Sequence, residues 1–181
     1  MITLDDKLKK AGCPYRFFPE ALKRKKFTEL FRNRIRSTVY PSLKESLTEP
    51  GSIACFTPDQ ESPLEYYSSF GYLYTYCVNA GLPDNLLPKY LSKEEVLDSL
   101  SVREYDQIYT RATLFIDLVN ADDTSFSPEI AYKFSNFVYS RYMKGYSTVL
   151  CLHKSLSTCT SITPFLKTFL ANESRMISTK D

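Results

Sequence analysis

Repeated helix-start patterns constrain the fold of this chain more than any other feature of its sequence. A Ser or Thr that is followed by Pro, or by an acidic residue three positions later, can satisfy the free amide groups of a first helical turn. Five such patterns begin at Ser62, Ser92, Ser101, Ser127 and Thr163. They predict an all-α protein, an irregular bundle of about 7–9 helices.

Hydrophobic periodicity supports this interpretation in three places. Apolar residues recur at the spacing of one buried helix face between Ser101 and Asn120, which predicts a helix over that range. A second predicted helix runs from Ser127 to about Lys144, and Gly145 fits its C-terminal cap. The tyrosines of residues 71–78 alternate with period two, as in a strand, but they also fit a helical stripe. We interpret that segment as helix, and the strand alternative stays open.

The distribution of turn-forming residues predicts how the bundle is organised. Residues 1–48 form a basic N-terminal helical segment, which includes a predicted helix from 19 to 39. Residues 49–61 contain two prolines, a glycine and several small polar residues, so we expect a connecting loop there. Residues 62–175 form the helical body. The loop is too short to separate independent domains, and one compact domain is expected overall.

Charge is unevenly distributed along the chain. Residues 1–50 carry twelve Lys and Arg against six Asp and Glu, whereas residues 51–181 carry eleven against fifteen. The near-neutral total therefore combines a basic end with an acidic body. Such a division is typical of a segment that binds nucleic acid or an acidic partner, and equally of a solvated helix face.

The predicted helix over residues 19–39 contains the candidate nucleic-acid contacts. On a helical wheel Lys25, Arg32 and Arg36 share one sector, where they could follow a phosphate backbone together with the adjacent Lys26. Glu29 lies in the same sector at salt-bridge spacing and weakens this positive patch. The sequence leaves both alternatives open, a phosphate-binding surface or a solvated face.

Three further residues near this helix are candidates for contact with a partner. Arg34 falls inside the apolar stripe of the helix, so its guanidinium needs a carboxylate or carbonyl groups from the body or from an interface. Phe17 and Phe18 come just before the helix, beside basic residues. They could anchor the helix entry in the core or stack on unpaired bases.

Catalytic and metal-binding patterns are missing from the sequence. His153 is the only histidine, and its spacing from Cys151 does not suit a nucleophile and its base. The five cysteines are scattered without a C-x-x-C pair, which excludes a typical structural zinc site and favours reduced thiols. Neither G-x-x-x-x-G-K-[ST] nor G-x-G-x-x-G occurs. We therefore expect no catalytic residue, no metal and no cofactor.

These observations predict a small intracellular, noncatalytic helical protein that acts by protein–protein interaction, as an adaptor, an inhibitor or an assembly subunit. The alternative is a regulatory protein that binds RNA or DNA through residues 19–39, and a third hypothesis is an enzyme of unknown type. We expect a protein partner or self-association, with nucleic acid as the other candidate partner. Residues 1–10 contain no apolar stretch of the length that a signal peptide requires, and no uncharged run approaches the length of a membrane span, so we expect neither secretion nor membrane association. Its size and scattered cysteines would suit a viral or pathogen-encoded accessory factor.

Overall fold

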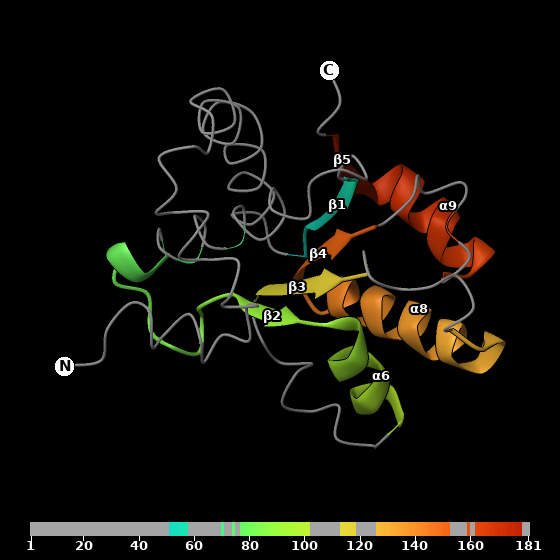
Figure 1. Cartoon of the computed structure of the whole chain (residues 1–181). Helices are drawn as coiled ribbons and strands as arrows, with labels where there is room; N and C mark the ends of the chain where they lie inside the picture. The colour runs from blue at the N-terminus through green and yellow to red at the C-terminus, as the bar shows by residue number, and fades with distance from the viewer. Residues whose placement is uncertain are drawn as a thin grey trace, which may run out of the picture.

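Among the residues that the structure describes, five parallel strands form one sheet (Figure 1). The computed structural model describes residues 51–57, 70, 74, 77–101, 113–118, 126–152, 159 and 162–178. The strands are β1 Ile53–Thr57, β2 Lys89–Leu91, β3 Thr113–Asp117, β4 Ser147–Cys151 and β5 Ser174–Ser178. Their order across the sheet is β2-β3-β4-β1-β5, and every neighbouring pair is parallel. Three helices alternate with them, namely α6 Lys93–Ser101, α8 Pro128–Met143 and α9 Pro164–Glu173.

This α/β architecture shows that the predicted all-α bundle of about 7–9 helices is wrong. Parallel neighbours cannot be joined by a hairpin, so each pair needs a crossover connection, usually a helix. Three of the five helix-start patterns, at Ser92, Ser127 and Thr163, belong to helices of these crossovers. Such patterns carry no information about the short strands between the helices.

The strands β3 and β4 escaped prediction because they are buried on both faces. Every residue of β3 and of β4 is buried. A strand covered on both faces shows a continuous apolar run without polar alternation, and periodicity alone cannot distinguish such a run from a buried helix segment. The helix predicted from Ser101 to Asn120 is therefore wrong over β3. In the same way, β1 lies within residues 49–61, where we expected a connecting loop.

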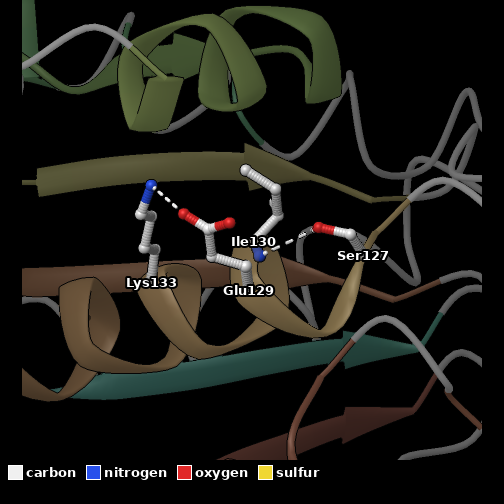
Figure 2. Close-up of polar contacts among 4 residues, drawn as sticks. All are labelled: Ser127, Glu129, Ile130 and Lys133. Atoms are coloured by element: carbon white, nitrogen blue, oxygen red, sulfur yellow. Dashed lines mark hydrogen bonds and ion pairs between the residues drawn. The ribbon is translucent and has the colours of Figure 1, made fainter.

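The helix predicted from Ser127 to about Lys144 is confirmed by α8. Figure 2 shows Ser127 at the N-terminus of the helix, where its hydroxyl accepts a hydrogen bond from the Ile130 amide at 3.3 Å. One turn along, Lys133 Nζ lies 2.7 Å from Glu129 Oε1. Gly145 adopts φ +78° directly after the helix, as expected of a C-terminal cap.

Two other predicted helix starts are also confirmed. Ser92 and Glu95 form both bonds of a capping box before α6, at 2.8 and 3.2 Å. Thr163 caps α9 by accepting a hydrogen bond from the Leu166 amide, with Pro164 at the first helical position. Ser101, in contrast, is the last residue of α6. The pattern at Ser62 and the division of the chain at residue 48 lie outside the described residues and stay predictions.

The sheet separates two apolar layers. On one face, α6, α8 and α9 contribute Val96, Phe134, Val138, Leu166 and Leu170 to a core with Ile53, Leu114, Ile116 and Leu150 of the strands. On the other face, the Phe70 ring makes edge contacts with Phe115 at 5.0 Å and Tyr90 at 5.7 Å between ring centroids. Phe70, Tyr74 and Cys77 are helical and buried, which agrees with the helical interpretation of the tyrosine-rich segment.

The junction between α8 and β4 is held by a buried arginine. Arg141 has no exposed surface, and its guanidinium donates to Thr148 Oγ1 at 3.0 Å and to the Ser147 carbonyl at 2.7 Å. The guanidinium also lies over the Tyr146 ring, 5.4 Å from its centroid. The sequence drew attention to Arg34 as an arginine on an apolar face, but it did not reveal Arg141. Within the described part of the chain, no helix is long and apolar enough to cross a membrane.

Candidate functional site

The strand order identifies the edge of the sheet where a ligand would bind. In open parallel sheets, ligands bind outside the carboxyl ends of the strands, where neighbouring connections leave in opposite directions. Here the chain leaves β1 toward β2 at one edge of the sheet, whereas it leaves β4 toward β5 at the other edge. The switch point therefore lies between β1 and β4 (Figure 1). The carboxyl ends of β1, β4 and the adjacent β3 form the candidate site, which we call the carboxyl edge.

Asp117 is the main polar side chain at the carboxyl edge. It ends β3 after the buried apolar residues Leu114, Phe115 and Ile116, and only 3% of its surface is exposed. In P-loop NTPases a carboxylate helps to hold the magnesium ion of the nucleotide. In this protein the hydroxyl of Tyr90, from β2, donates a hydrogen bond to Asp117 Oδ2. The carboxylate is therefore bound by a side chain of the neighbouring strand.

Cys151 lies beside Asp117 at the end of β4. The two residues are paired in the register of the sheet, and the Leu118 amide donates to the Cys151 carbonyl at 2.9 Å. Burial, followed by electrostatic interactions with Asp117 and Cys55, raises the pKa of the Cys151 thiol well above its ordinary value. A thiol that stays protonated at neutral pH is a poor nucleophile and a poor metal ligand. His153, the other member of the pair considered from the sequence, lies beyond the described residues.

The chain does not fit the nucleotide that this kind of edge holds in P-loop proteins. Their phosphate loop follows a strand and supplies glycine amides and a lysine. Here residues 58–63, which follow β1, read Pro-Asp-Gln-Glu-Ser-Pro and contain neither glycine nor lysine. Their two acidic residues would repel a triphosphate. The described residues also contain no group of three or more His, Cys, Asp or Glu that could hold a metal ion.

The site residues predicted from the sequence are not part of this edge as described. Arg34, Phe17 and Phe18, and the cations Lys25, Lys26, Arg32 and Arg36, all precede residue 51, where the described structure begins. Sequence reasoning missed Asp117 and Tyr90. The available signal was the apolar run from Leu114 to Ile116 that ends in a carboxylate, a pattern typical of a buried strand with a polar end.

Comparison with known proteins reveals similarity only among solved structures, since neither a protein-family model nor a curated protein sequence matches the chain. Domain III of the replication initiation protein DnaA from Thermotoga maritima matches with a TM-score of 0.64 at 15% identity, over 83% of this chain and 66% of that one. A replication initiator DnaA bound to AMPPCP and single-stranded DNA matches with a TM-score of 0.58 at 12% identity, over 81% and 46%. AMPPCP-bound DnaA from Aquifex aeolicus matches with a TM-score of 0.58 at 11% identity, over 82% of this chain and 46% of that one.

These matches define the class of fold. The chain has an α/β fold like that of domain III of DnaA, and it spans just under two thirds of the first matched chain and less than half of the other two. This fold overturns the predicted noncatalytic helical interaction module, because that prediction depended on an all-α bundle and the chain instead folds around a parallel sheet like that of DnaA. At 11–15% identity the similarity establishes the fold alone.

Proposed function

We propose that this chain acts in DNA replication as a protein that binds single-stranded DNA without hydrolysing ATP. The observation that supports this most is the parallel sheet, whose fold matches a replication initiator bound to single-stranded DNA over 81% of the chain. The inference from initiators to this chain is an analogy at the level of the fold. A role in replication would place the protein inside the cell.

The absence of hydrolysis follows from the sequence around the carboxyl edge. Phosphoryl transfer from ATP depends on positioning the phosphates and a magnesium ion. Residues 58–63 supply no lysine and no glycine for the phosphates. Asp117, the carboxylate in the position to hold a metal, is bound to Tyr90.

We assign the contacts with DNA to the cations Lys25, Lys26, Arg32 and Arg36. They belong to the part of the sequence with twice as many basic as acidic residues. A cation that neutralises a phosphate releases a condensed counterion, so binding through these residues weakens steeply with salt. Phe17 and Phe18 are proposed to stack on bases beside them, because aromatic rings bind unpaired bases with little sequence preference. Arg34 stays a proposed contact with an acidic group of the body or of a partner.

The test is the binding of a fluorescently labelled single strand, followed by anisotropy at about 50 mM and about 200 mM salt. We expect binding to single-stranded DNA that exceeds binding to duplex DNA and falls at the higher salt. The combined substitution Lys25→Ala, Arg32→Ala and Arg36→Ala should lower the slope of log affinity against log salt by roughly two. The matched control removes three lysines of the described body, Lys133, Lys144 and Lys167, and should leave the slope nearly unchanged.

Three outcomes would contradict this proposal. Wild-type protein that binds neither single-stranded DNA nor duplex DNA would rule out the DNA partner. Equal losses in the two triple variants would show that general charge, rather than the assigned cations, produces the binding. Steady release of phosphate from ATP, lost in Asp117→Asn, would show that the protein is an ATPase.

A further inference from the structure

We infer that the carboxyl edge of this sheet does not bind a metal ion or a nucleotide, because Asp117 is engaged in an internal hydrogen bond with Tyr90. This inference depends on the fold and on the geometry of the pair. It does not depend on the proposed DNA partner.

Strand register places the two side chains on the same face of the sheet. Tyr90 of β2 is paired with Phe115 of β3, and Asp117 lies two residues beyond Phe115. Successive side chains of a strand alternate between faces, so Tyr90, Phe115 and Asp117 share one face. From this position the Tyr90 hydroxyl donates to Asp117 Oδ2. The hydrogen bond thus joins the end of β3 to the edge strand β2.

The Tyr90 ring is fixed by its neighbours. Only 1% of its surface is exposed, and the Phe70 ring contacts it at a centroid distance of 5.7 Å with an interplanar angle of 69°. Phe70 also contacts Phe115, at 5.0 Å and 78°. A close-packed aromatic cluster does not allow one ring to swing out without opening the whole cluster. The hydroxyl therefore stays on the carboxylate.

A magnesium ion would find an unsuitable set of ligands at this edge. Magnesium requires oxygen ligands in near-octahedral geometry and keeps several of its waters. Asp117 is almost fully buried and one of its oxygens already accepts the Tyr90 hydroxyl. Its neighbour in the register is the protonated thiol of Cys151, which is not a ligand that magnesium prefers. Among the described residues, no group of three or more His, Cys, Asp or Glu side chains could hold the ion there.

The charge of the segment that follows β1 also disfavours nucleotide binding. Asp59 and Glu61 follow β1, where a phosphate loop would supply a lysine and glycine amides. The sequence after β1 thus supplies acidic residues in place of the lysine and glycines that bind the phosphates of magnesium–ATP in P-loop proteins. The protein should consequently behave identically with and without magnesium and nucleotide.

Thermal unfolding and calorimetric titration of the full-length protein test this inference. The probes are magnesium chloride alone, magnesium–ATP and magnesium–AMPPCP. We expect no heat of binding and no change in melting temperature for any of them. A ligand present at one hundred times its Kd would raise the melting temperature by roughly 5–10 °C, which is easily detected.

Variants of the pair distinguish a structural role from a metal-binding one. Tyr90→Phe should lower the melting temperature by roughly 4–10 °C, since it removes a buried hydrogen bond to a charged group. The control, Tyr132→Phe on the exposed face of α8, should not change it. The inference is overturned if magnesium–ATP stabilises the wild type and Asp117→Asn abolishes that effect. It is also overturned if Tyr90→Phe melts like the wild type. If Tyr90→Phe does not fold, the titration of the wild type with magnesium chloride and the magnesium–nucleotide complexes is the test of the inference.

Discussion

Several buried polar side chains of this protein lie at the ends of strands or contact them. Asp117 and Cys151 end β3 and β4, and Arg141 contacts the first two residues of β4. Polar groups that are buried need hydrogen-bond partners, and strand ends provide carbonyls and hydroxyls that no neighbouring strand has used. The Arg141 guanidinium donates hydrogen bonds to one such carbonyl and one such hydroxyl. Asp117, Cys151 and Arg141, which carry ionisable groups, therefore stabilise the sheet.

The buried thiol of Cys55 should make the stability of the protein depend on alkaline pH. Burial raises the pKa of this thiol from its ordinary value of 9.0 to about 11. Above about pH 9 the unfolded chain loses the proton while the folded protein keeps it, so the unfolded state is favoured. This stability is fully present below pH 9.0 and is lost as the pH rises toward 11.

Urea unfolding of the wild type and of Cys55→Ala, at about pH 7 and about pH 10, checks this prediction. The wild type should lose roughly 1–2 kcal/mol more than the variant across that interval. Other groups that titrate in this range are common to both proteins and cancel in the comparison. An identical pH dependence in the two proteins would show that Cys55 does not titrate differently in the folded state.

The junction of β1 with α8 gives a prediction at the level of elements. Gly51 precedes β1 with φ +74°, and a Cβ atom there would lie 2.9 Å from the Tyr142 carbonyl oxygen near the end of α8. Gly81 has a similar φ of +73° but open space around it. Gly81→Ala should therefore cost only the backbone strain, about 1 kcal/mol. Gly51→Ala should cost at least about 2 kcal/mol, because the strand must also move away from the helix.

Denaturant unfolding of both glycine variants measures this difference directly. The comparison isolates the contact between β1 and α8, since backbone strain is present in both. Equal losses in the two variants would mean that the junction can open at no cost.

The helices of this protein could be predicted from local sequence, whereas its strands could not. Ser127, Pro128 and Gly145 determine the ends of α8 by hydrogen bonds and backbone angles that involve only near neighbours. The strand β3 depends on partners far along the chain, since Thr113 pairs with Ser147 in β4. Its apolar run is compatible with both a helix and a strand, and only those partners select the strand.

The candidate site was harder to predict than the helices for the same reason. Tyr90 and Asp117 are 27 positions apart, and only the register of β2 with β3 brings them together. Cys151 reaches Asp117 through the register of β3 with β4. A single sequence shows each of these residues separately, so we concentrated on the charge-rich segment before residue 51.

At the scale of the whole molecule, the last strand along the chain covers the first. β5 pairs with β1 along its full length, from Ile53 with Ser174 to Thr57 with Ser178, and β4 pairs with its other side. Without β5, β1 would become an edge strand with an apolar sequence and no charge to prevent pairing with another chain.

A chain that ends at Glu173 should consequently lose cooperative unfolding and elute from size exclusion as large oligomers. A chain that ends at Ser178 keeps β5 and is the matched control, which should melt like the full-length protein. Monomeric elution and unchanged melting of the shorter chain would mean that β1 is protected by something other than β5.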